Sequence, residues 1–142
     1  MQSRLVNESP HTYVLVFDTG DEVIEALSTF ASANAITACS ITAIGAFSKA
    51  EVGYFDLSIK DYKPIEIAEQ VEVLSLIGDI TTYKGKPKIH AHVVLGKADG
   101  TAHGGHLLKA YVNPTLEMVI TELPTYLHRE LDEASGIPLI KL

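Results

Sequence analysis

Histidines are concentrated in one short segment, KIHAHVVLGKADGTAHGGHLL, which spans residues 88–108 and holds four of the six histidines of the chain. His90 and His92 are separated by a single residue. Successive side chains of a β-strand point to opposite faces, so a strand here would project these two imidazoles side by side. Two aligned imidazoles could bind a metal, act as acid/base groups or belong to the polar face of a sheet.

The position of a third histidine depends on the turn that the residues ADG at 98–100 predict. A two-residue turn would bring His103 onto the histidine face and leave His106 behind it. A three-residue loop with a left-handed glycine would place His106 directly opposite His92. The second register builds a cluster of His90, His92 and His106, and the chemistry of metal sites favours it.

Three imidazoles with a fourth coordination position left open are typical of catalytic rather than structural zinc sites, and the open position can bind and activate water. Nickel, iron and copper also accept imidazole, so the ligand set alone does not name the divalent transition metal. Zinc is the expected one. Gly104 and Gly105 come directly before His106 and carry no side chains. We therefore expect them to leave room for a small ligand.

Two carboxylates are candidates for the same pocket. Glu117 stands alone among apolar neighbours in PTLEMVI, and Glu51 lies in the segment KAEVGYFDL. Either could orient a histidine ligand or act as a general base toward a bound water. The alternative for Glu117 is an ordinary position on the solvated face of a sheet.

The other residues capable of chemistry are assigned no role. His11, His103 and His128 have no partner that the sequence identifies, and Cys39 lies in an apolar run that predicts a buried, inert thiol. The lysines of YKGKPK at 83–88 are typical of a solvated turn. With 11 basic and 18 acidic residues the net charge is −7, which opposes binding to a polyanion such as DNA.

The 142 residues are enough for one domain with a single core. No apolar run approaches the roughly 20 residues of a membrane-spanning helix, and no secretory signal is evident, so we expect a cytoplasmic protein. The expected fold is α+β, a mostly antiparallel sheet with one main helix.

The expected helix begins after an N-cap at Asp21 or Thr19, and its apolar stripe is Val23, Ile24, Leu27, Phe30 and Ala31. Strands are expected at 11–18, in AITACSITAIGAF, in KAEVGYFDL, after a turn at DYKP in IEIAEQVEVLSLIGDITTY, and in the histidine hairpin. A further strand is expected in PTLEMVITEL, where Leu116, Met118 and Ile120 alternate with Glu117, Val119 and Thr121.

The segments TAIGAF, EVGYFD, VEVLSLIGDI and HAHVVLGKADGTAHGGHLLKAYVNPTLEMVI together resemble the plant and prokaryote conserved (PPC) domain, in its prokaryotic single-domain form. The resemblance covers roughly residues 10–125 and leaves 126–142 as a C-terminal tail. It implies a homotrimer and the historical label of a predicted DNA-binding protein. In plant relatives, AT-hook segments outside the domain bind DNA, and this chain has no R-G-R-P segment. The resemblance also implies that His90, His92 and His106 occupy the metal positions of prokaryotic members.

Two hypotheses follow. The first is a trimeric cytosolic protein with a three-histidine metal site in a pocket near a subunit boundary. This site would bind a small anionic or polar ligand, and hydrolysis at the metal is left open. The second is a non-catalytic assembly or regulatory module that acts through partners or DNA. An ordered metal and a general base such as Glu117 would favour the first, whereas a contiguous basic face would favour the second.

Overall fold

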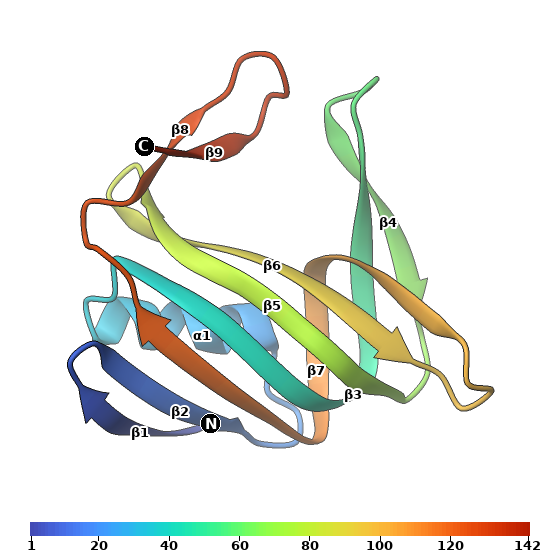
Figure 1. Ribbon diagram of the computed structural model, residues 1–142. Coiled ribbons are helices and arrows are strands. Elements are labelled where there is room, and N and C mark those ends of the chain that lie inside the picture. Colours follow the sequence, from blue (N-terminus) through green and yellow to red (C-terminus); the bar gives the residue numbers. More distant parts are fainter.

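The computed structural model describes residues 1–142, which form nine strands and one helix (Figure 1). The strands are β1 (Gln2–Glu8), β2 (His11–Phe17), β3 (Ala38–Asp56), β4 (Asp61–Ile67), β5 (Val71–Tyr83), β6 (Lys86–Gly96), β7 (Ala102–Glu122), β8 (His128–Leu131) and β9 (Pro138–Lys141), and the helix is α1 (Val23–Ala33). The fold, expected to be α+β, is therefore made mainly of strands and has one short helix. That helix lacks the length that crossing a membrane requires.

All nine strands belong to one sheet in the order β1-β2-β7-β3-β5-β8-β9, with β4 paired to β3 and β6 paired to both β5 and β7. The long strands β3 and β7 each serve two regions of the sheet. β3 pairs first with β5 and then with β4, while β7 pairs first with β6 and finally with β2. The pairings β3–β5, β5–β6, β6–β7 and β7–β3 close on themselves, so the sheet is strongly bent (Figure 1).

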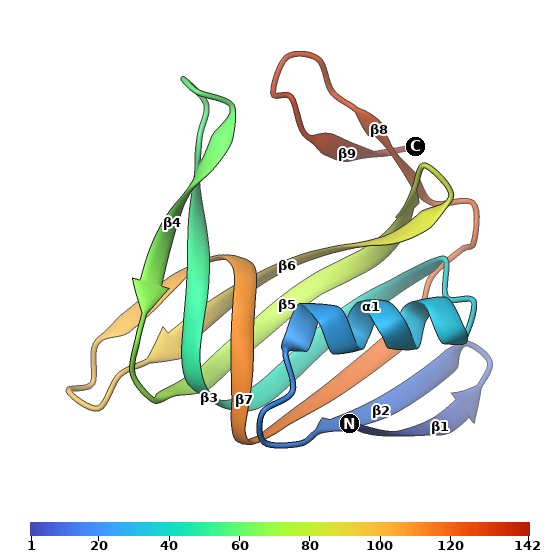
Figure 2. The ribbon, with the colours of Figure 1, turned by 180° about the vertical axis from the view of Figure 1, so that it is seen from behind.

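The side-chain alternation of β6 separates the core from the opposite side of the sheet. Its buried residues are Ile89, Ala91, Val93 and Leu95, and the residues between them are Lys88, His90, His92 and Val94. Helix α1 packs on the buried side, across the sheet (Figure 2). The side that carries the histidines, called the outer face below, has no helix over it.

The apolar stripe of the helix is confirmed, but its start was assigned to the wrong residue. Glu22 is the N-cap, and its carboxylate accepts hydrogen bonds from the amides of Ile24 and Glu25. The carboxylate of Asp21 is instead paired with the terminal ammonium group at 2.9 Å, and the hydroxyl of Thr19 donates to a carbonyl of the β7 segment. Both expected caps are occupied by contacts that are distant in the sequence.

Two strand boundaries also differ from the expectation. The runs on either side of residue 48 form one continuous strand, β3, which accommodates its bend through register shifts near Gly45 and Phe47. The DYKP segment lies inside β4, not in a turn. The chain reverses at residues 57–60, where Lys60 adopts a φ of 52°.

The histidine hairpin takes the three-residue register. His92 pairs with His106 and Gly96 with Ala102, which leaves residues 98–100 as the loop inside a bond from the Lys97 amide to the Thr101 carbonyl. The last loop residue is left-handed, with a φ of 81°. The register that chemistry favoured is therefore confirmed.

The C-terminal tail is part of the sheet. Strands β8 and β9 form a hairpin that meets β5 through a single parallel pairing, Thr82 with His128. In Figure 1 this hairpin and the β3–β4 hairpin both extend beyond the bent sheet at its upper edge. Both hairpins contribute residues to the site described next.

Candidate metal centre

Three histidines lie together on the outer face of the sheet. His90 and His92 come from β6, and His106 comes from β7. Their ring centroids are 5.2 Å apart for His90 with His92, 5.2 Å for His90 with His106 and 5.5 Å for His92 with His106. One ring nitrogen from each lies within 4.8 Å of the other two. The cluster holds three ligand groups, so a metal bound here would keep a coordination position open.

The strands that carry the histidines are held close together by glycine. A Cβ atom at Gly78 of β5 would lie 2.2 Å from the carbonyl oxygen of His90 and 2.7 Å from the Cα of Ala91. No side chain fits in that space, so Gly78 lets β5 approach β6 directly beneath His90. The same approach brings Asp79, which follows Gly78, opposite His90 in the strand register.

Tyr62 of β4 fixes the ring of His106 from the other side. The two rings stack with centroids 4.4 Å apart and an interplanar angle of 23°. Gly53 makes room for this stack, since a Cβ there would lie 2.7 Å from the Tyr62 ring. The Nδ1 atom of His106 is buried and has no hydrogen-bond partner. A buried ring nitrogen without a partner costs free energy, and a metal ion would relieve that cost.

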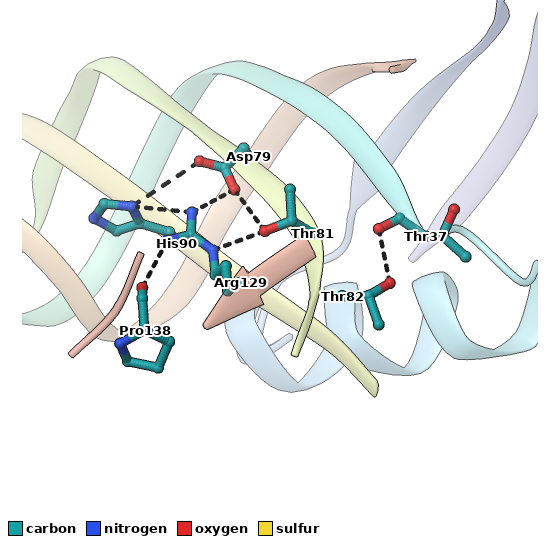
Figure 3. Close-up of polar contacts among 7 residues, drawn as sticks. All are labelled: Thr37, Asp79, Thr81, Thr82, His90, Arg129 and Pro138. Carbon is teal, nitrogen blue, oxygen red and sulfur yellow. Dashed lines mark hydrogen bonds and ion pairs between the residues drawn. The ribbon is translucent and has the colours of Figure 1, made fainter. Parts of the chain in front are cut away.

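An ion pair ties the C-terminal hairpin to His90 (Figure 3). The Arg129 guanidinium of β8 donates to Asp79 Oδ1 at 2.7 Å, to the Thr81 hydroxyl at 2.7 Å and to the Pro138 carbonyl at 3.0 Å. The other Asp79 oxygen lies 3.9 Å from His90 Nδ1, and Arg129 Nη2 lies 3.4 Å from the same nitrogen. Carboxylates beside a ligating imidazole orient the ring and increase its basicity, so Asp79 and Arg129 are placed to position His90.

The electrostatics of the cluster favour neutral imidazoles. Burial lowers the pKa of His106 to about 4, and the neighbouring His90 and His92 add to the effect. Burial, and then the nearby Arg129, also lower the pKa of His90. Both rings are therefore neutral near pH 7, which is the state that ligates a metal. The unpaired nitrogen, the spacing and the protonation state all fit a bound transition metal.

A hollow of about 140 Å³ adjoins the cluster between the two projecting hairpins. Its lining comprises Tyr62 from β4, Lys88, Ile89 and His90 from β6, His106 from β7, and Arg129, Ile137, Pro138 and Leu139 from the C-terminal segment. None of these nine residues is acidic. The segment expected to be a C-terminal tail beyond the domain core thus supplies one wall of the hollow.

Glu117, Gly104 and Gly105 are not part of this hollow. Glu117 pairs with Ile44 near the far end of β7 and lines a different, apolar hollow, so it is not placed to act on a ligand at the histidines. A Cβ at Gly104 would lie 2.7 Å from the Val93 carbonyl oxygen, and one at Gly105 would lie 2.8 Å from the Gly53 carbonyl oxygen. Both glycines allow strands to approach, so they do not provide ligand space.

The remaining candidates lie apart from the cluster. Glu51 lines a separate hollow with Glu66, Lys49 and Lys109. His11 and His128 form exposed pairs with Glu122 and Glu130, and His103 contacts Thr101 in the hairpin. Cys39 is buried, and burial raises the pKa of its thiol to about 12, which confirms the expected inert state.

Sequence reasoning missed Arg129, Asp79 and Tyr62. Tyr62 and Arg129 reach the cluster from strands distant in sequence, whereas Asp79 lies opposite His90 in the β5–β6 hairpin and had a local signal. The GD pair in SLIGDI places a charge next to a glycine inside an apolar strand, which suggests a close strand approach beside a buried ionic contact.

The bent antiparallel sheet and the open three-histidine cluster define a small β-rich domain with a candidate metal centre. The profile of the Plants and Prokaryotes Conserved (PCC) domain matches residues 5–124. The chain belongs to this family, which confirms the resemblance found in the sequence. No curated protein matches the chain.

Solved structures agree on the fold. A metal-containing protein from Archaeoglobus fulgidus is 33% identical, with 99% of this chain and 97% of that chain covered and a TM-score of 0.86. A PPC protein from Pyrococcus horikoshii is 30% identical, with 99% and 95% covered and a TM-score of 0.88. A "putative dna binding protein" from Bacteroides thetaiotaomicron is 27% identical, with 92% and 91% covered and a TM-score of 0.88.

Replacing Asp79 by Asn tests the positioning of His90. The change removes the charge beside the imidazole and leaves the buried Arg129 without its counter-ion. We expect the affinity for zinc to fall about tenfold or more. We expect the free energy of unfolding to fall by on the order of 3 kcal/mol, the lower end for buried pairs, because the Asp79 side chain is 22% exposed. Chelator competition and urea titration measure the two effects.

The control is Asp99→Asn, because Asp99 is exposed in the loop of the same hairpin and its hydrogen bonds to Thr101 can be kept by Asn. Equal zinc affinity in both variants would show that Asp79 does not position the cluster.

Proposed function

We propose that this protein binds a divalent transition metal, with zinc as the expected ion, through His90, His92 and His106, and that the metal site receives a small ligand. The observation that carries the proposal is the convergence of three ring nitrogens within 4.8 Å, one ring having a buried nitrogen that lacks any partner. The similarity to a metal-containing archaeal protein over nearly the whole chain supports it.

A metal held by three imidazoles acts as a Lewis acid toward a ligand at its open position. The residues of this chain would hold and orient the ligand set. Asp79 and Arg129 position His90, while Tyr62 fixes His106 and shields it from water. Hydrolysis would also need a general base, and no carboxylate lines the hollow. The proposal is therefore ligand binding rather than a defined reaction.

Replacing His92 by Ala removes the exposed member of the cluster. We expect the purified variant to lose its bound metal, since two imidazoles make a much weaker site than three, while its fold is retained. Elemental analysis of protein expressed without added metal measures the difference, with about one metal per chain expected in the wild type.

His103→Ala is the matched control. It removes an exposed histidine from the same hairpin and should leave the metal content unchanged. Wild-type metal content in His92→Ala would overturn the ligand assignment, and absence of metal from the wild type would overturn the proposed function.

We also propose that the protein assembles as a homotrimer. Four large apolar side chains on the outer face, Ile44, Leu74, Ile77 and Val119, are between 42% and 61% exposed and line one shallow hollow. Contiguous apolar surface of this kind is unusual on a monomer and is typical of an interface. Ile77 is the cross-strand neighbour of His92, so a subunit covering this face would border the metal centre.

Ile44→Lys tests the interface. A charged side chain at this position should remain solvated in the monomer but would be costly to bury between subunits. We expect light scattering to give a mass near three chains for the wild type and one chain for the variant. Leu57→Lys is the control, because Leu57 is 71% exposed in the turn after β3 and lies outside the apolar hollow. A trimer that persists in Ile44→Lys would place the interface elsewhere.

A non-catalytic regulatory module is the second candidate, and the similarity to the "putative dna binding protein" from Bacteroides thetaiotaomicron is the observation in its favour. We propose no direct contact with DNA. The net charge of −7 opposes it, and the lysines at 84, 86 and 88 form only a short basic segment around the β5–β6 turn.

A further inference from the structure

We infer that the hollow beside the histidine cluster binds a small organic carboxylate, whose anionic group lies between the cluster and the ammonium group of Lys88. The inference rests on the proposed function, because it names the class of ligand for that site. It gives a role to a lysine that the sequence assigned to a solvated turn.

Lys88 is directed to the site by strand geometry. It lies two residues before His90 on β6, so the two side chains share the outer face, and it lines the hollow together with His90 and His106. Its ammonium group forms no ion pair, whereas Lys63 and Lys97 each pair with a carboxylate. Lys88 therefore offers a positive charge that no group of the chain neutralises.

Arg129 lines the same hollow but is not available to a ligand. Its side chain is only 4% exposed, and its donors are directed at Thr81, Pro138, Asp79 and the Nδ1 atom of His90. The charge of Arg129 is balanced by Asp79, so the pair adds little net charge to the hollow. With no acidic residue in the lining, the excess charge is the positive charge of Lys88.

The opposite wall is apolar and the hollow is small. Ile137, Pro138 and Leu139 face the cluster together with the ring of Tyr62. The volume of about 140 Å³ corresponds to about five water molecules at roughly 30 Å³ each. A carboxylate with a short hydrocarbon body matches both the charge and the wall. The positive charge of Lys88 would repel an organic cation, and a large polyanion would not fit in the hollow.

Calorimetric titration of propionate into the metal-loaded protein tests the inference. We expect wild-type protein to bind propionate, Lys88→Gln to bind it at least tenfold more weakly with its metal content unchanged, and n-propylammonium not to bind. Lys86→Gln is the matched control, since Lys86 lies two residues earlier on the same strand but lines a different hollow. It should bind propionate within twofold of the wild type.

Two results would overturn the inference without affecting the metal assignment. One is a metal-loaded wild type that does not bind propionate, and the other is equal propionate affinity in Lys88→Gln and Lys86→Gln. If the wild type holds no metal, the proposed metal binding is wrong. The same titration then applies to the metal-free protein, where propionate binding lost only in Lys88→Gln would retain the carboxylate site alone.

Discussion

The pairing register of β6 with β7 is the constraint on which the site depends. In this register His106 lies directly across from His92, and His90, two residues before His92, projects from the same face of the sheet. A slip of one residue would move a histidine to the opposite side of the sheet, where Ala91 and Val93 are buried. The three-residue loop with its left-handed Gly100 and the close contact of Gly104 with β6 enforce the register.

Side-chain contacts of the β8–β9 hairpin connect the site to the C-terminal end of the chain. The β8–β9 hairpin shares only one ladder pairing with the rest of the sheet, so its position relies on side-chain contacts. Among these, the ion pair of Arg129 with Asp79 is nearly buried and lies next to His90. Charges removed from water are costly unless they are well paired. The contact that anchors the hairpin is thus the same contact that orients a histidine and closes the hollow.

Local patterns in the sequence predicted the local parts of this arrangement. The His90–His92 alternation, the hairpin loop and the helix stripe depend on residues close in sequence, and the structure confirms them. Contacts between distant strands could not be predicted this way. Tyr62 and Arg129 meet the histidines only because β3 and β7 bend and the tail returns to β5. Glu117 was misplaced for the same reason, since β7 is long enough to carry it into another region of the sheet.

On the proposal above, three imidazoles and no sulfur bind one transition metal in this protein. X-ray absorption at the zinc edge of the purified protein tests it most directly, because the spectrum reports the ligand atoms without reference to activity. We expect about three nitrogen ligands at about 2.0–2.1 Å and one further light atom. A sulfur shell at about 2.3 Å, or a shell of oxygen ligands without imidazole scattering, would contradict the claim.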